Sequence, residues 1–232
     1  MIKFYSFIAF ISSALCFSQY NDNLSYGLKV AALHSKTTNI PEMLIGREHN
    51  LTNFQMKTKG VYSVEGGFFV NYKFSNTRTA IQPELIYRKG GEKLHYYNSQ
   101  SGQEYDIDFK YSYLILGSIY KIYPYEGLNF GIGVHYAKNL TPHNIEYSSN
   151  EFDGRHDTNY RQFYRDGIIG KDDFNLSFNV GYELANDFHF DLRYYLGIGD
   201  AIGTRSTSFQ FTENTNRNSF LALSLGYSFH NW

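Results

Sequence analysis

The sequence predicts an all-β fold, namely an eight-stranded antiparallel transmembrane β-barrel with short periplasmic turns and long extracellular loops. Three observations predict it. Large apolar residues alternate with polar or small residues along eight segments, and two residues is the period of a β-strand. The segments run for roughly 9–13 residues, whereas about 9–11 residues cross a bilayer as a tilted strand and about 5–6 are usual in globular proteins. The connections between the segments alternate between short and long.

The composition excludes several other classes of protein. Among 232 residues there are 22 Tyr and 20 Phe, which is too aromatic for a disordered chain. The 21 basic and 22 acidic residues balance, so the chain lacks the basic surplus of a nucleic-acid binder. A single Cys allows neither an internal disulfide framework nor a cysteine-based zinc site. Mean hydropathy is −0.42, and beyond the N-terminus no apolar run approaches the ~18–20 residues of a membrane helix.

Residues 1–18 have the pattern of a signal peptide that is cleaved on export. Lys3 supplies a positive charge, residues 4–15 are apolar, and Cys16 and Ser18 are small residues before a cleavage site at Gln19. Lipidation at Cys16 is the alternative, which the bulky Leu15 before it disfavours. No linker divides the remainder, so residues 19–232 are predicted to form one outer-membrane β-barrel domain.

The eight expected strands follow one another in a regular order. The segment 174–184 shows the pattern most clearly, because each even position is large and apolar and each odd position is polar or Gly. The segment 111–122 is apolar on both faces, so its register stays open. In chain order, the expected strands are 26–34, 62–74, 79–89, 111–122, 128–136, 174–184, 188–196 and 221–229. The short connections are 75–78, 123–127 and 185–187, and the long ones are 35–59, 90–108, 139–173 and 199–219.

In a membrane barrel the apolar stripe of each strand faces lipid and the polar stripe faces the lumen. A soluble, lipocalin-like barrel would place the apolar stripe inside. Many Gly and small polar residues on the polar stripe suit a narrow lumen and favour the membrane arrangement. Tyr and Phe gather near strand ends, as in aromatic girdles at the two membrane interfaces. These residues are Tyr26, Tyr72, Phe74, Tyr123, Tyr125, Phe188 and Phe229 on the turn side, and Tyr62, Tyr87, Tyr136 and Phe174 on the loop side.

The predicted inward stripe brings charged residues together. A buried charge costs several kcal/mol unless it is paired, and side chains fill the lumen of an eight-stranded barrel. A structural salt-bridge network is therefore expected, rather than a proton or ion path or a catalytic carboxylate pair. Its predicted members are Lys29, Glu65, Lys73, Glu84, Arg88, Glu183, Asp191 and Arg193.

The sequence predicts no catalytic residue, no bound metal and no cofactor. It contains no G-x-S-x-G, P-loop or H-E-x-x-H motif, and its eight His lack ligand spacing. His34-Ser35 was weighed as half of a hydrolase site. The segments 153–157 and 171–173 were weighed as cation sites, with solvated loop charge as the favoured interpretation.

Several strings resemble the PorT-like outer-membrane β-barrel family. Gln82-Pro83-Glu84-Leu85-Ile86-Tyr87-Arg88-Lys89-Gly90 resembles that family's third strand, and Asp191-Leu192-Arg193-Tyr194-Tyr195-Leu196-Gly197 its seventh. Gly181-Tyr182-Glu183-Leu184 and Leu225-Gly226-Tyr227-Ser228-Phe229 are similar to its sixth and eighth strands. The resemblance spans nearly the whole mature chain. It implies an eight-stranded outer-membrane barrel without catalysis, and the name-giving member is associated with machinery that secretes proteins across the outer membrane.

The last strand is expected to carry the signal read by the barrel-assembly machinery. Phe229 is the expected terminal aromatic, because counting back from Trp232 would turn Ser228 and Gly226 toward lipid. The signal comprises Leu221, Leu223, Leu225, Tyr227 and Phe229.

These features together predict a non-enzymatic integral outer-membrane protein with a structural or interaction role through its extracellular loops. Its expected partners are outer-membrane lipid and lipopolysaccharide, the barrel-assembly machinery, and a protein of a secretion or surface complex, but no nucleic acid. An enzyme that modifies outer-membrane lipid and a small passive pore are the alternatives.

Overall fold

The computed structural model describes residues 23–38, 54–150, 162, 166–204 and 216–229. Eleven strands follow one another in these residues: β1 (Leu24–Thr38), β2 (Phe54–Lys73), β3 (Thr79–Asn98), β4 (Glu104–Ile122), β5 (Leu128–Asn139), β6 (Ile145–Ser149), β7 (Ile168–Gly170), β8 (Asp173–Glu183), β9 (Phe188–Gly197), β10 (Ile202–Thr204) and β11 (Arg217–Phe229). Among the described residues, no helix is long and apolar enough to cross a membrane.

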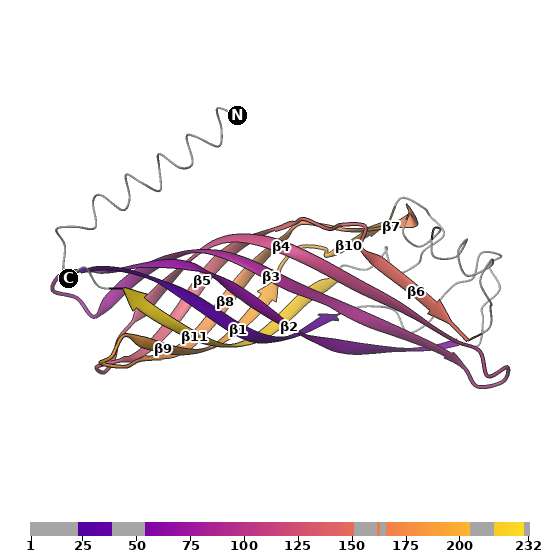
Figure 1. Ribbon diagram of the computed structural model, residues 1–232, viewed down its shortest axis with the longest axis horizontal. Helices are drawn as coiled ribbons and strands as arrows, with labels where there is room; N and C mark the ends of the chain where they lie inside the picture. Colours follow the sequence, from indigo (N-terminus) through magenta and orange to yellow (C-terminus); the bar gives the residue numbers. More distant parts are fainter. Residues whose placement is uncertain (1–22, 39–53, 151–161, 163–165, 205–215, 230–232) are drawn as a thin grey trace, which may run out of the picture.

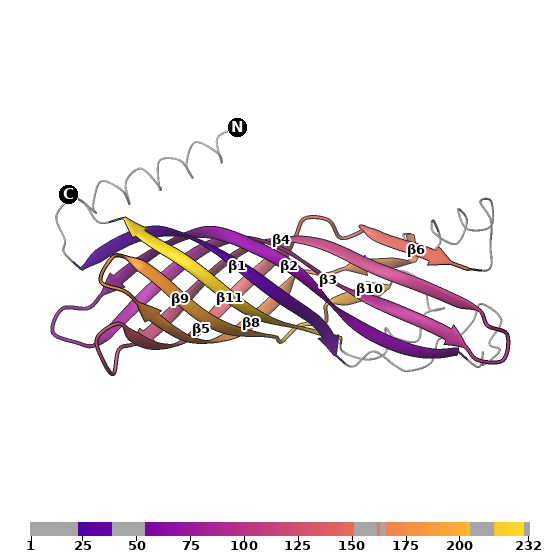
Figure 2. The ribbon, with the colours of Figure 1, turned by 60° about the horizontal axis from the view of Figure 1, so that its bottom comes forward.

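Eight of these strands close into a barrel (Figures 1 and 2). Going around it, the order is β1, β2, β3, β4, β5, β8, β9 and β11, and every pairing is antiparallel, including the closing pair of β1 with β11. Closure matters because hydrocarbon offers no partner to a free backbone N–H or C=O group. The prediction of an eight-stranded transmembrane barrel is confirmed.

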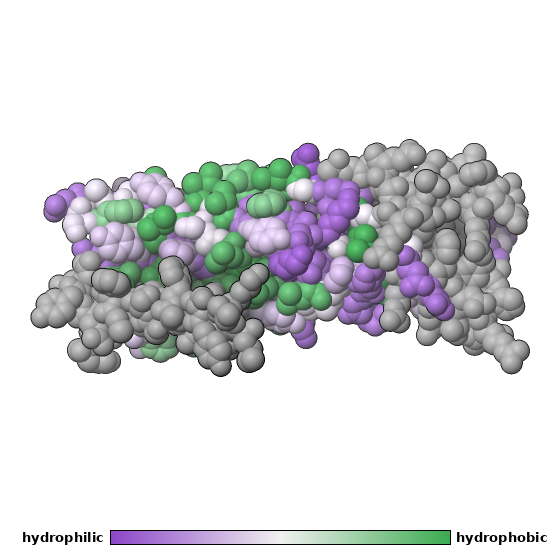
Figure 3. All heavy atoms as spheres, turned by 90° about the horizontal axis from the view of Figure 1, so that it is seen from above, coloured by the Kyte–Doolittle hydropathy of each residue, from purple (hydrophilic) through white to green (hydrophobic). Residues whose placement is uncertain are grey.

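The two faces of the barrel wall have opposite character. Large apolar side chains stand outward, with Val64 60% and Leu223 63% exposed, while charged side chains such as Glu84 and Arg193 are buried inside. Figure 3 shows hydrophobic residues gathered over the middle of the barrel, with hydrophilic residues on the side of the projecting strands. This is the inverse of a soluble barrel, so the apolar stripe faces lipid as the sequence predicts.

The structure settles the register of the segment that is apolar on both faces. On β4, Tyr113, Ile115 and Ile119 are buried, while Leu116 and Tyr120 are exposed. Both faces are apolar because β4 contacts lipid on one side and packs inside the barrel on the other.

One predicted loop is in fact mostly strand. Residues 90–108 were expected to be a loop, but β3 continues to Asn98 and β4 begins at Glu104, so that the two form a long hairpin. Similarly, β2 already begins at Phe54. The same positions continue to face inward, but here the inward residues are apolar and the outward ones charged, since Leu94 and Ile107 are buried while their neighbours carry charge. Figure 1 shows this hairpin, with β6 beside it, extending past the barrel.

The opposite end of the barrel consists of tight turns. Asn76, Gly127 and Asp187 adopt φ values of 63°, 76° and 68°, in the left-handed region that favours Gly, Asn and Asp. The start of β1 and the end of β11 lie at this same end, where Tyr26 pairs with Phe229. Short periplasmic turns and long extracellular connections therefore segregate as predicted.

A charge placed on the lipid-facing wall should destabilise the protein according to its depth. Leu223→Arg, near the middle of β11, is expected to lower the free energy of unfolding by about 2–4 kcal/mol. Thr38→Arg, outward at the extracellular end of β1, should cost about 0–1 kcal/mol. Urea-dependent unfolding from lipid vesicles measures both. Equal effects at the two positions would contradict the assignment of the lipid-facing wall.

Candidate functional site: a plugged lumen and a projecting sheet

Glu84 is the centre of the charge network inside the barrel. Its carboxylate accepts hydrogen bonds from Arg193 at 2.7 and 3.2 Å, from Lys29 at 2.8 Å and from the Gln82 amide at 2.6 Å. The Nε2 atom of His135 lies 3.6 Å away. Two cations from different strands therefore converge on one carboxylate, in a bidentate geometry that Arg favours.

A second ion pair lies beside the first. Arg88 donates to Glu65 through Nε at 2.8 Å, and its Nη2 forms an ion pair with the same carboxylate oxygen at 2.8 Å. Its guanidinium group lies 4.0 Å from the centre of the Tyr195 ring and 4.5 Å from that of Phe220, which gives it two aromatic faces. The Tyr195 hydroxyl joins the two pairs, since it accepts from Arg193 at 3.0 Å and donates to Glu65 at 3.4 Å.

Asp191 reaches this network through a neighbouring amide. The Asn179 amide nitrogen donates to Asp191 at 3.0 Å, and the Asn179 carbonyl accepts from Arg193 Nε at 3.1 Å. Asp191 and Arg193 thus share one face of β9, as their spacing predicts, with Asn179 of β8 between them.

Glu183 organises the periplasmic mouth of the lumen. It accepts from Lys121 at 3.4 Å and from Lys73 at 3.0 Å, and the Lys73 side chain is half exposed, so this cation lies at the mouth and not within the lumen. The Tyr123 hydroxyl also donates to Glu183, at 2.7 Å. Burial and the Glu183 carboxylate raise the pKa of this tyrosine. The assignment of Tyr123 to a lipid-facing girdle was therefore wrong.

The upper lumen is less polar than the sequence suggested. Leu33, Ile86, Ile115 and Phe220 point inward and are buried there, and Phe69 is buried near the periplasmic end, against His189. Side chains of both kinds therefore fill the interior, as eight strands require. The chemistry open to these carboxylates is limited, because Glu65, Glu84 and Glu183 are each held by a cation and Asp191 is held by the Asn179 amide.

Sequence reasoning missed several members of the network: Gln82, Lys121, His135, Asn179, His189 and Tyr195. All stand on the inward stripe, so the alternation that located Glu84 and Arg193 contained the signal. Five of them carry no fixed charge, so a pattern of charged residues does not reveal them, and Lys121 lies in the segment 111–122, whose register the sequence leaves open.

The His34-Ser35 pair does not form a catalytic dyad. Consecutive strand residues point to opposite faces. The His34 ring packs on Tyr62 outside, with ring centres 4.9 Å apart, whereas Ser35 is buried inside and donates to the Gly91 carbonyl at 2.6 Å.

Of the two candidate cation segments, the structure describes 171–173. Asp172 accepts from Tyr136 Oη at 2.7 Å, from Lys138 at 2.8 Å and from the Asn139 N–H at 2.9 Å, so its carboxylate is occupied. Residues 153–157 lie outside the described residues. Within the described ranges, no group of three or more His, Cys, Asp or Glu is placed to hold a metal ion.

The strands β2, β3, β4 and β6 continue beyond the barrel as a projecting sheet, made of residues 54–60, 92–98, 104–110 and 145–149. One face is apolar and buried, with Tyr96 stacked on Tyr105 at 4.5 Å. The other carries cross-strand ion pairs, including Lys93 with Asp106 at 2.9 Å and Lys110 with Glu146.

The contacts on the charged face shift the pKa values of its residues. Hydrogen bonding to Asp106 raises the pKa of Lys93. Burial alone would raise the pKa of Asp106, but hydrogen bonds from Lys93 and from His95, at 2.8 Å, outweigh it and lower that pKa. These contacts hold the projecting sheet in one arrangement above the membrane.

Glu92 lies where the projecting sheet meets the barrel. Its side chain is buried and accepts a hydrogen bond from the Thr37 backbone N–H. Burial raises the pKa of Glu92 to about 7. This carboxyl is therefore the titratable link between β1 and the base of the hairpin.

The sequence matches a known protein family over most of its length. The family profile described as "Outer membrane protein beta-barrel domain" matches residues 17–203, which is most of the chain. The chain belongs to this outer-membrane β-barrel family. Its place is accordingly the outer membrane. The match ends before β11, the strand that closes this family member's barrel. No curated protein matches the sequence.

Solved structures resemble this outer-membrane barrel at low sequence identity. Neisserial surface protein A aligns with a TM-score of 0.42 and 11% identity, covering 90% of this chain and 100% of that one. OprG from Pseudomonas aeruginosa aligns at 0.44 and 14%, covering 90% and 96%. The outer membrane protease OmpT from Escherichia coli aligns at 0.40 and 12%, covering 90% and 98%. These likenesses carry no information about activity.

Removing the bidentate cation should destabilise the barrel. Arg193→Met leaves Glu84 buried with a reduced set of donors and is expected to lower the free energy of unfolding by about 3–5 kcal/mol. The control Lys73→Met, at the half-exposed mouth, should cost less than about 1 kcal/mol. Adding Glu84→Gln to Arg193→Met should recover part of the loss. An Arg193→Met protein as stable as the parent would refute a structural role for the network.

Glu92 should make stability fall as pH rises. Between pH 4.5 and about 7 the folded protein keeps a proton on Glu92 that the unfolded chain has released, so the free energy of unfolding decreases across this window and then levels off. Glu92→Gln should lose this component, whereas Glu104→Gln, at the exposed end of the hairpin, should retain it. Urea unfolding from vesicles at several pH values measures the slopes. Identical slopes for parent and Glu92→Gln would contradict this prediction.

Proposed function

We propose that this outer-membrane barrel is a non-enzymatic surface protein that binds a protein partner through its projecting sheet. The observation that carries the proposal is the unbroken pairing of β3 with β4 from the barrel up to Tyr97 and Glu104. Binding residues commonly lie on exposed segments held by a rigid scaffold. Here the scaffold itself extends past the lipid-facing wall, which gives an ordered surface in place of a long irregular loop.

The β2 edge of the projecting sheet supports a role in strand addition. In the described residues, Phe54–Gly60 of β2 pairs with β3 alone. An open edge offers N–H and C=O groups to an extended peptide. Exposed Lys57 and Lys59 on the β2 edge disfavour pairing between two copies of the chain, as lysines on natural sheet edges do. The favoured partner is therefore a different protein.

The plugged lumen argues against the alternative of a passive pore. Arg88, Arg193, Glu65, Glu84 and Tyr195 meet within the lumen, all buried and hydrogen-bonded to one another. The same pairing argues against enzymatic use of the lumen carboxylates. The opposed directions of His34 and Ser35 argue against the other enzymatic candidate.

The narrower parts of the proposal come from the sequence. The PorT-like strings favour an association with protein secretion across the outer membrane. Residues 1–18 are proposed as the signal peptide. Outer-membrane lipid and lipopolysaccharide, and the barrel-assembly machinery, complete the proposed partners. The proposed assembly signal, Leu221, Leu223, Leu225, Tyr227 and Phe229, forms one exposed stripe on β11, while Ser228 is buried.

Shortening the projecting hairpin should abolish partner binding. In the test variant, Asn-Gly replaces residues 94–107, which keeps the pairing of Lys93 with Asp108. In the control, Asn-Gly replaces only the turn at 99–103. Crosslinking in intact cells is expected to capture a partner with the parent and the control but not with the shortened protein. Mobility on gels before and after boiling verifies that each variant folds.

Three outcomes would contradict the proposal. Capture of the same proteins by the shortened variant would exclude the projecting sheet. A stable conductance in planar bilayers would favour the pore. A change in the mass of lipid A when the gene is deleted would favour the enzyme.

A further inference from the structure

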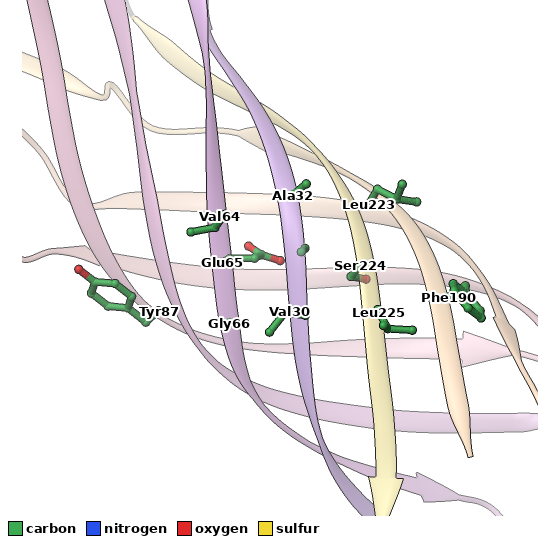
Figure 4. A pocket seen from close by; sticks show the side chains of 11 residues that line it. Val30, Ala32, Val64, Glu65, Gly66, Tyr87, Phe190, Leu223, Ser224 and Leu225 are labelled. Atoms are coloured by element: carbon green, nitrogen blue, oxygen red, sulfur yellow. The ribbon is translucent and has the colours of Figure 1, made fainter. Parts of the chain in front are cut away.

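The lipid-facing wall contains an apolar groove across five strands. Its volume is about 690 Å³, and its outward lining residues are Val30, Ala32, Val64, Gly66, Tyr87, Phe190, Leu223 and Leu225 (Figure 4). In the sheet register, Tyr87, Gly66, Val30, Leu225 and Phe190 form one row from β3 to β9. Small residues on β1 and β2 thus lie between large side chains on either side, which creates a hollow open to lipid.

Packing of the barrel does not require the small residue in this hollow. A Cβ atom at Gly66 would meet its nearest neighbour, the Lys29 carbonyl oxygen, at 3.6 Å, which is an ordinary contact. At Gly67, by contrast, it would approach the Leu85 carbonyl oxygen to 2.2 Å. Gly67 is needed for the wall to close, whereas the absence of a side chain at Gly66 serves only to keep the hollow open.

Directly above the groove stand three lysines with no ion pair among the described residues. Lys36 lies four residues beyond Ala32 on β1, or about 13 Å along the strand. Lys89 lies two residues beyond Tyr87 on β3, and Lys59 lies farther from the groove, on β2 opposite Lys93. All three point outward and are exposed. Between this basic cluster and the groove lies the aromatic pair of His34 and Tyr62.

Three other exposed lysines toward the extracellular end of the barrel are ion-paired. Lys110 pairs with Glu146, Lys138 with Asp172 at 2.8 Å and Lys171 with Asp200 at 2.6 Å. Among the described residues, the three lysines above the groove differ from these in having no ion pair.

We infer that this wall binds a phosphorylated lipid of the outer leaflet. One acyl chain lies in the groove over Ala32 and Gly66, and headgroup phosphates contact Lys36, Lys59 and Lys89. One lipid molecule then gains both the apolar burial of its acyl chain and the ion pairing of its headgroup, because the distance from the groove to the lysines suits the distance from an acyl chain to a headgroup. The inference does not depend on the projecting sheet, but it rests on the proposal that lipopolysaccharide is a partner of the barrel.

Charge disfavours a second copy of the chain as the occupant. Two copies in one membrane share an orientation, so a two-fold contact through this groove would bring both basic clusters together at the same height. Like charges repel at such an interface, whereas a phosphate-bearing lipid neutralises them.

The test is native mass spectrometry of the purified, folded protein in micelles containing diphosphoryl lipid A or, separately, phosphatidylcholine. The parent is expected to retain diphosphoryl lipid A in preference to phosphatidylcholine. The Lys36→Gln, Lys59→Gln, Lys89→Gln variant should bind diphosphoryl lipid A at least about tenfold more weakly. The matched control, Lys110→Gln, Lys138→Gln, Lys171→Gln, removes the same charge where it is already paired and should change binding less than about twofold.

The Ala32→Leu, Gly66→Val variant fills the groove without altering charge. It should also weaken retention of diphosphoryl lipid A, and its heat-dependent gel mobility verifies folding. Equal losses in the two lysine variants would overturn the inference. So would equal retention of both lipids by the parent, or a dimer that the groove-filling variant abolishes while lipid retention is unchanged.

Discussion

The structure depends on one constraint, the requirement that every backbone N–H and C=O group within hydrocarbon has a partner inside the protein. The pairing of β1 with β11, from Tyr26 opposite Phe229 to Thr38 opposite Arg217, meets that requirement by closing the sheet. Once the sheet is closed, alternation assigns each side chain to lipid or to lumen. The outward side chains can then be apolar without a cost in free energy, because they face lipid. The charged inward side chains are buried and need partners to offset the cost of desolvation.

The solution inside the barrel is a small set of shared contacts. Glu84 of β3 pairs with Lys29 of β1 and with Arg193 of β9. Tyr195 joins this group to the pair of Arg88 and Glu65. An eight-stranded barrel has no room for both this network and an open channel. Selection for a closed barrel therefore leaves the projecting sheet and the outer wall as the surfaces on which function can vary.

Much of this follows from the sequence because lipid enforces a strict period of two. The clear alternation over residues 174–184 and 188–196 predicts β8 and β9 almost to the residue. The outward direction of Phe229 likewise follows from parity. Even the inward positions of Glu84 and Arg193 need only the pattern of their own strands.

The rest depends on contacts between strands that are distant in sequence. Above the membrane the outer face of the sheet meets water, so the outward residues are polar and the inward residues Leu94 and Tyr96 are apolar. This is the opposite of the pattern within the membrane, and the sequence therefore predicts a loop where β3 continues. Tyr123 has the composition of a girdle residue, but only the approach of Glu183 explains why it turns inward. The groove needs the register of five strands, which no single segment specifies.

The most direct test of the lipid-facing assignment is a spin-label scan along β11 in lipid vesicles, with Cys16 replaced by Ser. Labels at Leu221, Leu223, Leu225 and Tyr227 should be accessible to oxygen dissolved in the bilayer, and labels at Ala222, Ser224, Gly226 and Ser228 should be shielded from it. The expected result is an oscillation of period two. Oxygen accessibility at the second set and not at the first, or the absence of any oscillation, would contradict the account.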